Sequence, residues 1–368
     1  MQNKFCIAPF VTLATTANGR TRLCCQADEN WDFTINDKTV DEVFNSDYHK
    51  QARQDILDGK WAKQCHRCKS LEEKGISSRR SLENDRFKHL DWEKLVTEPK
   101  IHSLDLRFGN QCNLACVMCG PRNSVLWYED YEKIDHLAEF GRDDIGLLWG
   151  VKGSIIDDLD NYLNDVEIIY FSGGEPLLNK KYFQLLQLLI DKGLNKQIKI
   201  VQDTNGTLLT QDVVDTLQKF KHAQLNFSID GVGEVVEYIR YPIKYETILE
   251  KLDLLKDSNL FVCLQPALGA HNLVQWGEII NLQKEFNFPQ INISISHWPE
   301  FMQFQHMTDK TKQKIIDNFS NTKHGRMRNI VKTLKLDGSK PTALIKYFEQ
   351  IDELRNLNHK PLFPWLYE

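Results

Sequence analysis

The residues with the clearest chemical potential are three cysteines in one short stretch. Cys112, Cys116 and Cys119 have Cys-x3-Cys-x2-Cys spacing and follow alternating apolar and polar residues at 104–108. Three thiolates bind three irons of a four-iron cube and leave one iron open to a small molecule. A zinc knuckle or unpaired core thiols are the alternatives, but structural zinc has four protein ligands and the loop contains no histidine. The spacing therefore favours an iron–sulfur cluster with one open coordination site.

A glycine-rich turn follows about fifty residues later. The apolar run at 166–172 ends in Gly173-Gly174-Glu175-Pro176. Glycines let a ligand approach the backbone closely, and the carboxylate is available to a cation. By itself this turn is also typical of an ordinary loop, so its weight comes from its combination with the three cysteines.

Together, the two motifs resemble those of the radical S-adenosylmethionine (SAM) superfamily. The resemblance covers residues 1–300 in outline and is most specific at 112–119 and 172–176. It implies a [4Fe–4S] cluster whose open iron binds the amino and carboxylate groups of SAM. It also implies that the Gly-Gly-Glu turn hydrogen-bonds the SAM amino group, and that reductive cleavage of SAM yields a 5′-deoxyadenosyl radical.

A second set of cysteines precedes this region. Cys6, Gly19 and Cys24 form a Cys-x12-Gly-x4-Cys pattern, and Cys65 and Cys68 form a Cys-x2-Cys pair. Four such thiols suit either zinc or a second iron–sulfur cluster, and spacing alone does not separate the two.

Here too a resemblance helps. The pattern is similar to the Twitch module, half of a SPASM domain, which implies an auxiliary [4Fe–4S] cluster held by all four thiols. Cys24 is favoured over the adjacent Cys25 because it satisfies the Gly-x4-Cys spacing. The usual module follows the barrel, whereas this one precedes it, so its docking cannot be assumed.

The elements that would position the N-terminal cysteines are a hairpin and helices. Asn18-Gly19 is a hairpin turn signal between strands at 10–14 and 20–24, and this unit does not look like part of a barrel. Apolar residues recur at helical spacing over 40–63, just before the Cys-x2-Cys pair. His66 and Arg67 between that pair are expected to be solvated, and the charged stretch 69–100 is interpreted as a helical linker.

From residue 102 onward, strand-like and helix-like stretches alternate. The predicted strands are 102–108, 166–172, 197–203, 224–230, 260–267 and 291–296; the predicted helices are 180–192, 210–220, 245–257, 272–286 and 309–319. This order predicts an α/β fold with a parallel sheet, and it also suits a flat doubly wound sheet. Both motifs follow strand C-termini, as catalytic residues do in α/β barrels. The resemblance implies a partial (β/α)6 TIM-like barrel.

The predicted segments are therefore four: 1–75, the auxiliary-cluster module; 76–100, a helical linker; 101–300, the barrel; and 301–368, a helical extension. An aromatic insertion at 120–165 contains Trp127, Tyr128, Tyr131 and Trp149 and is expected to pack on the barrel. The extension includes a predicted helix at 341–357 and an aromatic end that would cover the open side of the barrel or the substrate.

Further site residues come from the strand at 225–230, where Asn226, Ser228 and Asp230 alternate with apolar residues. Buried polar groups need partners, which a polar cofactor would supply. In related enzymes this stretch and a later arginine contact SAM, which here implies Ser228 and Arg240. Asn205, in a turn after the third strand, is expected either to contact the ribose or to make a turn.

Other polar residues and one cysteine complete the list of candidates. Pocket candidates for a catalytic base are Asp105, Arg107, Asp203 and Asp230, among which the sequence does not choose. Cys263, in an apolar strand, is predicted to be a core thiol.

Composition limits the partners. The net charge is −5, which disfavours a nucleic-acid partner or an anionic membrane surface, and no apolar run approaches the roughly 20 residues of a membrane span. Most of the nine cysteines occur in short clusters that suit metal ligation in a reducing cytoplasm, and a signal peptide is not expected.

The resemblance implies an oxidoreductase that uses SAM, the auxiliary cluster as an electron acceptor, and a reductant such as flavodoxin or ferredoxin. A peptide or protein side chain is the leading substrate class, as in peptide maturases. The alternatives are a dehydrogenase of a small alcohol or aminocyclitol, a non-catalytic iron–sulfur or zinc protein, and a nucleotide- or RNA-modifying radical SAM enzyme.

Overall fold

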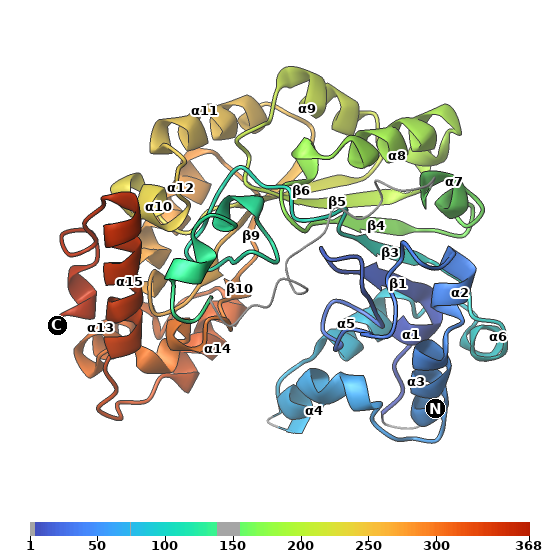
Figure 1. Ribbon diagram of the computed structural model, residues 1–368, viewed down its shortest axis with the longest axis horizontal. Helices are drawn as coiled ribbons and strands as arrows, with labels where there is room; N and C mark the ends of the chain where they lie inside the picture. The colour runs from blue at the N-terminus through green and yellow to red at the C-terminus, as the bar shows by residue number, and fades with distance from the viewer. Residues whose placement is uncertain (1–3, 74, 138–154) are drawn as a thin grey trace. The chain divides into compact units, whose positions relative to one another are not determined.

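The computed structural model describes residues 4–73, 75–137 and 155–368 (Figure 1). Its contacts divide the chain into two compact units. The first unit comprises Met1–Gln111, Gly146–Gln202 and Lys219–Ala223; the second comprises Cys112–Ile145, Asp203–Gln218 and Gln224–Glu368. The bounds of these units differ from those of the four predicted segments. The division of the chain by function into those segments stays a prediction.

The sheet of the first unit begins with the N-terminal hairpin. Its strands are β1 (Thr12–Thr15), β2 (Thr21–Arg22), β3 (Ser103–Leu106), β4 (Ile168–Phe171) and, as far as Gln202, β5 (Lys199–Thr204). β1 pairs antiparallel with β2 and parallel with β3, and β3, β4 and β5 are parallel in that order. The hairpin is thus confirmed, but the expectation that this segment lies outside the barrel sheet is wrong. Its partner strand is about ninety residues away, beyond the reach of local patterns.

The helices of the first unit are α1 (Ala8–Val11), α2 (Val40–Phe44), α3 (Asp47–Leu57), α4 (His66–Glu73), α5 (Arg79–Arg86), α6 (Trp92–Thr97), α7 (Ile155–Asp160) and α8 (Lys180–Asp191). The strand predicted from Phe10 begins only at Thr12, because α1 precedes it with Pro9 in its first turn. The helix predicted over 40–63 is interrupted by Asn45 and Ser46 and ends at Leu57.

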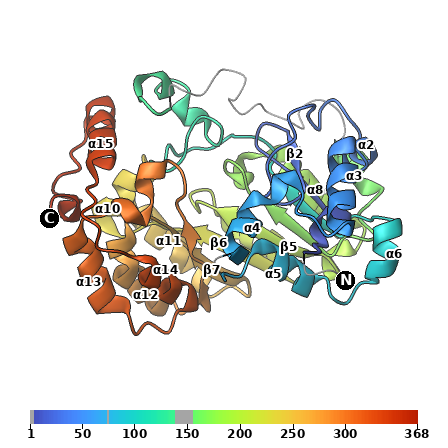
Figure 2. The same cartoon turned by 90° about the horizontal axis from the view of Figure 1, so that it is seen from below.

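The two faces of this sheet have different coverings. Ala14, Asp105, Tyr170 and Val201 lie side by side across β1, β3, β4 and β5, so their side chains share one face. Tyr170 and Val201 pack in a hydrophobic cluster with residues of the N-terminal segment: Phe5, Ile7, Phe10, Val11, Ile56 and Phe87. α1 contacts α3, α5 and α6 there (Figures 1 and 2).

On the opposite face, Phe171 packs edge-on against Tyr182 of α8, with ring centroids 4.9 Å apart. The N-terminal segment therefore covers the sheet face opposite α8, a docking that the sequence left open.

The second unit contains β7 (Phe261–Gln265), β9 (Gln290–Ile291) and, from Gln224 onward, β6 (Ala223–Ser228). β7 is parallel to both β6 and β9. A separate pair, β8 (Ala267–Leu268) and β10 (Ser294–Ile295), is also parallel. The strand predicted at 291–296 is therefore split between two sheets. As predicted, Leu225, Phe227 and Ile229 are buried, and so is Cys263 of β7.

The helices of the second unit are α9 (Gln211–Gln218), α10 (Gly233–Ile239), α11 (Tyr245–Lys256), α12 (Trp276–Glu285), α13 (Asp309–Phe319), α14 (Gly325–Thr333) and α15 (Thr342–Arg355). All but α10 and α14 were predicted, with ends shifted by a few residues. In Figure 2, α13 and α14 lie together near α12. Parallel strands alternate with helices in both units, so the fold is α/β, as a partial TIM-like barrel requires.

The aromatic insertion and the tail are mostly packed. Trp127 and Tyr131 are buried, as expected, whereas Tyr128 is partly exposed and Trp149 lies outside the described residues. Near the C-terminus, Phe363 is buried against Phe348 of α15.

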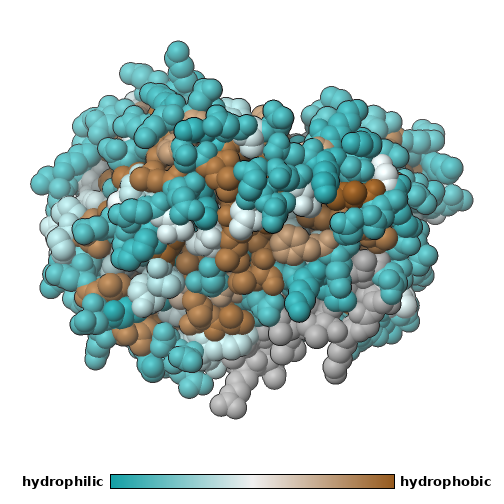
Figure 3. Space-filling model, turned by 90° about the horizontal axis from the view of Figure 1, so that it is seen from above, coloured by the Kyte–Doolittle hydropathy of each residue, from teal (hydrophilic) through white to brown (hydrophobic). Residues whose placement is uncertain are grey.

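Hydrophilic residues dominate the surface in the view of Figure 3. Among the described helices, none combines the length and apolar character needed to cross a bilayer.

Candidate metal and cofactor sites

The three-cysteine loop lies in the second unit. Cys116 is buried, and Cys112 and Cys119 are half-buried. A hydrogen bond between the Cys116 and Cys119 thiols lowers the pKa of Cys116, which the Arg240 charge lowers further. The same bond, burial, and the neighbouring Cys116 and Cys112 raise the pKa of Cys119 well above its usual value. The loop therefore brings its three sulfur atoms into one electrostatic environment beside an arginine.

Backbone hydrogen bonds hold this loop from both sides. The Ala115 and Val117 N–H groups donate to the carbonyls of Tyr241 (2.7 Å) and Ile239 (2.8 Å). From α15, Arg355 donates to the Ala115 carbonyl at 2.9 Å and the Tyr347 hydroxyl donates to the Val117 carbonyl at 2.8 Å.

The C-terminal helix is thus a positioning element for the loop. From the sequence this helix was predicted without a role, and only the aromatic end after it was expected to cover the barrel or the substrate. The one available signal was that Tyr347 and Arg355 share a helix face, which says nothing about what they contact.

Asn205 lies directly beside the loop. Its amide nitrogen contacts the Cys112 sulfur at 3.8 Å and donates to the Asn113 side chain at 2.9 Å. Its amide oxygen accepts from the Thr207 N–H at 3.0 Å, which makes a turn of the kind expected from Asn. Asn205 therefore makes the predicted turn and also reaches a predicted cluster ligand, which the sequence did not indicate.

Arg240 has a protein partner. Its Nε lies 2.7 Å from Asp230 Oδ2, and both side chains are buried. Asp230 also accepts a hydrogen bond from the Ala267 N–H at 2.6 Å. Asp230 is therefore the counterion of Arg240, which makes it a poor candidate for a free base. Ser228 is half-buried at the end of β6, and its proposed contact with SAM stays a prediction.

A buried histidine next to this pair was missed. His271 is fully buried, and burial together with the Arg240 charge lowers the pKa of His271 to about 3, so the ring is neutral at neutral pH. Neither ring nitrogen has a hydrogen-bond partner among the described residues. No motif marks this residue in the sequence, because it follows the short strand β8 in an otherwise apolar segment.

The Gly-Gly-Glu turn lies in the first unit, where its glycines allow two chain segments to touch. Gly173 has φ +115°, and a Cβ there would lie 3.0 Å from the Gly109 carbonyl oxygen. A Cβ on Gly174 would overlap the Gln111 carbonyl and lie 2.8 Å from the Asn110 carbonyl carbon. Glu175 donates its N–H to the Gln111 carbonyl at 2.7 Å. The turn therefore packs on the residues that immediately precede Cys112 in the chain.

The Glu175 side chain is oriented inward. It is 2% exposed, and its carboxylate accepts the Leu177 N–H at 3.2 Å. It thereby caps the short 3-10 helix at Pro176–Leu178. Close packing of the backbone accounts for glycine at 173 and 174. From the sequence, these glycines were expected to let a ligand approach the backbone.

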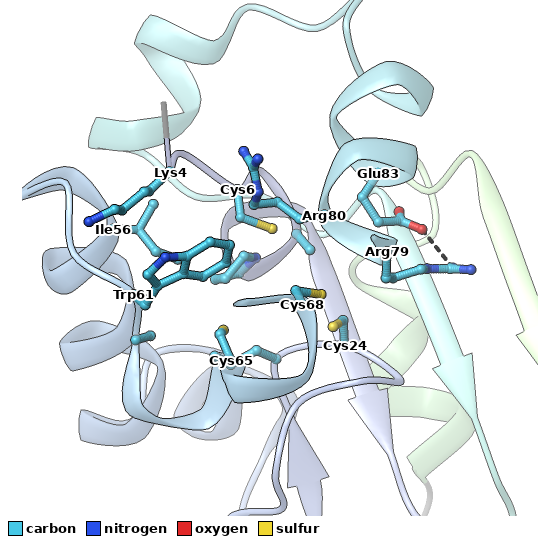
Figure 4. A pocket seen from close by; sticks show the side chains of 14 residues that line it. Lys4, Cys6, Cys24, Ile56, Trp61, Cys65, Cys68, Arg79, Arg80 and Glu83 are labelled. Atoms are coloured by element: carbon cyan, nitrogen blue, oxygen red, sulfur yellow. Dashed lines mark ion pairs between the residues drawn. The ribbon is translucent and has the colours of Figure 1, made fainter. Parts of the chain in front are cut away.

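The N-terminal cysteines line a single pocket of the first unit (Figure 4). Cys6 precedes α1, Cys24 follows β2, Cys65 ends a 3-10 helix at Lys63–Cys65, and Cys68 lies in α4. Trp61, Arg79 and Arg80 also line this pocket, whereas Cys25 is not among its lining residues. The four thiols that the sequence predicted therefore line one pocket, and Cys24 rather than Cys25 is among them.

Helix α5 fixes the segment that carries Cys6. Asn84 accepts the Ile7 N–H at 2.9 Å and donates to the Phe5 carbonyl at 2.9 Å. Arg80 also donates to the Phe5 carbonyl at 2.9 Å and forms an ion pair of 2.6 Å with Glu72 of α4. His66 and Arg67, as expected, are exposed.

The pocket suits a thiophilic metal centre. Burial raises the pKa of Cys65 to about 12, and burial likewise raises the pKa values of Cys6 and Cys24. Each neighbouring thiol adds to this effect, so thiolates here require a bound cation. Within the described ranges, no three His, Cys, Asp or Glu side chains form a group that could hold a metal ion, so the match to a metal centre rests on which residues line the pocket.

Comparison with known proteins places the loop and the turn in one family. Residues 106–282 match the family model described as the Radical SAM superfamily. The chain contains a radical SAM domain. This radical SAM domain includes Cys112, Cys116 and Cys119 as well as the Gly-Gly-Glu turn, and the N-terminal cysteines precede it.

Several known proteins are similar to this chain. An AdoMet-dependent heme synthase of Methanosarcina barkeri is 26% identical over 200 residues, covering 52% of this chain and 49% of the relative. A GTP 3′,8-cyclase of Clostridium botulinum is 27% identical over 135 residues, covering 37% of each chain. The solved structure of native anSMEcpe with bound AdoMet is 17% identical, with a TM-score of 0.46 over 62% of each chain. The chain spans half or less of the length of these two curated relatives.

Proposed function

We propose that this chain is a radical SAM oxidoreductase with an auxiliary iron–sulfur centre. The observation that carries the proposal is the presence of two separate thiol sites. One is the three-cysteine loop inside the radical SAM domain, and the other is the pocket lined by Cys6, Cys24, Cys65 and Cys68.

Three thiols and their neighbours fit the SAM-binding cluster. Cys112, Cys116 and Cys119 would hold it, with Asn205 donating to the Cys112 sulfur. When bound, such a cluster supplies the electron that cleaves SAM and releases the 5′-deoxyadenosyl radical. The chain itself fixes the sulfur positions through Tyr347 and Arg355, and Arg240 offsets their negative charge. Binding of SAM by Gly173, Gly174, Glu175 and Ser228 is part of the proposal.

Four thiols fit the auxiliary centre. With four protein ligands every iron is occupied, so this centre offers substrate no open site and would carry an electron instead. Removal of one hydrogen atom and transfer of a second electron amount to a net oxidation of the substrate. This favours an oxidation over an isomerisation, and it calls for a reductant such as flavodoxin or ferredoxin in a reducing cytoplasm.

A peptide or protein side chain is the proposed substrate class. A small molecule is the second candidate, because the curated relatives include an AdoMet-dependent heme synthase and a GTP 3′,8-cyclase. The net charge of −5 argues against RNA.

The test is anaerobic reconstitution followed by metal analysis and a search for 5′-deoxyadenosine by mass spectrometry. The proposal predicts about eight irons per chain and SAM cleavage under reducing conditions. Zinc in the N-terminal pocket would remove the electron-transfer role, and an absence of deoxyadenosine would reject the enzyme. Inhibition of SAM turnover by tRNA would favour the RNA alternative.

A further inference from the structure

Arg355 of α15 is held between two aromatic rings inside the second unit. Its guanidinium carbon lies 4.5 Å from the ring centroid of Trp127, which is fully buried, and 4.7 Å from the ring centroid of Tyr241. From this position Arg355 donates to the carbonyl of Ala115, the residue directly before Cys116, at 2.9 Å. The two rings and this hydrogen bond therefore fix a positive charge beside the three-cysteine loop.

The rest of the Arg355 side chain has no anionic partner within the protein. Its Nε and Nη1 are shielded from solvent, and neither has an acceptor among the described residues. Burial lowers the pKa of Arg355, and the charge of Asp130 opposes that shift from a distance. Asp130 itself pairs with Lys133 at 3.3 Å, while Asp352, one turn earlier on α15, accepts the His359 N–H at 3.0 Å. The carboxylates around Arg355 are thus engaged elsewhere.

The other arginine beside the loop differs in this respect. Arg240 forms a buried ion pair with Asp230 at 2.7 Å, so its charge is already balanced. A buried charge without a counterion is costly, and a bound group of opposite charge would offset that cost. The hydrogen bond with Cys119 lowers the pKa of Cys116 most, and the charges of Arg240 and Arg355 lower it further. Arg355 therefore acts on the loop as a cation that the ionised loop would balance.

We propose that Arg355 is the counterion of the cluster bound by this loop and that its charge raises the reduction potential of that cluster. The inference rests on the proposed function and names a residue that tunes the same site. Three thiolates and their iron–sulfur core together form an anion, and net charge is one of the factors that set its potential. A fixed cation favours the more negative, reduced state, and it acts more strongly inside a protein than in water because the effective dielectric constant is lower.

The experiment is a redox titration of the anaerobically reconstituted full chain, followed by electron paramagnetic resonance. Arg355→Met keeps an apolar side chain of similar length between the two rings, and Arg355→Lys keeps the charge. Lys346→Gln is the matched control: it also removes a positive charge from α15, but at an exposed position where solvent and salt screen it. The signal of the auxiliary centre, which SAM should not alter, is the internal reference.

The SAM-sensitive signal is expected at a higher potential in wild type than in Arg355→Met. The difference should be about 59 mV or more, which corresponds to a tenfold change in the equilibrium constant of a one-electron reduction. Arg355→Lys should lie close to wild type because the charge is kept, and Lys346→Gln should match wild type. The auxiliary signal should keep its potential in every variant.

Equal potentials in wild type and Arg355→Met would overturn the inference. Equal shifts in Arg355→Met and Arg355→Lys would also overturn it, because they would show that the contact with Ala115 matters and the charge does not. If Arg355→Met takes up no iron in the loop, Arg355→Gln, which keeps an N–H donor, replaces it under the same criteria. A wild type without any SAM-sensitive signal would reject the proposed function as a whole, whereas a signal with an unshifted potential rejects only the role of Arg355.

Discussion

The two cysteine sites are built in opposite ways. The loop takes its three thiols from residues 112–119. Its backbone N–H groups donate to the carbonyls of Ile239 and Tyr241, and its carbonyls accept from Tyr347 and Arg355. The N-terminal pocket collects four thiols from separate elements that pack around a hydrophobic cluster. The first site is a local segment clamped in place, and the second is a product of tertiary packing.

This difference corresponds to the chemistry proposed for each site. A site with three ligands must leave one metal position open while its loop stays rigid. Hydrogen bonds to the backbone of the loop provide this rigidity without occupying the open position. A site with four ligands is closed, and enclosing it in packed helices protects it from solvent. Substitutions should therefore separate the two sites cleanly.

The largest effect is expected from Cys116→Ala. Removal of one of only three ligands should abolish formation of 5′-deoxyadenosine and lower the iron content from about eight to about four per chain. Iron analysis and mass spectrometry of the reconstituted protein measure both. The control is Cys263→Ala, a buried thiol of β7 that should keep its iron. Equal loss in both variants would contradict the assignment of the loop.

Cys65→Ala should separate the two activities. Iron should again fall to about four per chain, but cleavage of SAM should continue, since the loop cluster is intact. Formation of an oxidised substrate should stop. If Cys65→Ala also abolishes deoxyadenosine while the protein stays folded by circular dichroism, the two sites are not independent in the way proposed.

Gly174→Ala should disturb the first unit at the turn. The added Cβ would overlap the Gln111 carbonyl, and such overpacking costs about 1–3 kcal/mol. Because Gln111 precedes Cys112, SAM binding should weaken as well. Gly277→Ala in α12 is the control, because its Cβ has its nearest contact at 3.9 Å and alanine favours a helix. Denaturant unfolding compares the two, and equal stabilities would refute the packing role.

The smallest effect is expected from Tyr347→Phe. It removes the hydrogen bond to the Val117 carbonyl and should destabilise the protein by about 1 kcal/mol. SAM cleavage should slow modestly while the iron content stays unchanged, because the ligands remain. Tyr245→Phe on α11 is the control. A rate equal to wild type would show that the loop does not need this contact from α15.

Local patterns predicted much of this molecule. Alternation at Leu225, Phe227 and Ile229 and the periodicity of α8, α11 and α13 reflect interactions within a few residues, so the sequence displays them directly. The two cysteine motifs were recognisable because iron–sulfur ligation constrains residue type and spacing.

What could not be predicted depends on distant partners. Residue type does not reveal contacts that form only when distant segments of the chain come together. Examples are the pairing of β1 with β3, the hydrogen bond from Tyr347 to the Val117 carbonyl and the ion pair of Arg240 with Asp230. The same holds for the packing of Gly174 on Gln111, which was attributed to a ligand. His271 was missed because one histidine in an apolar segment has no distinguishing pattern.

The most direct test of the central claim is electron paramagnetic resonance of the reduced, reconstituted protein with and without SAM. Two reduced cluster signals are expected, of which SAM should change only one, and Cys116→Ala should remove the signal that SAM changes while leaving the other. A single signal in wild type, or a spectrum that SAM leaves unaltered, would contradict the account.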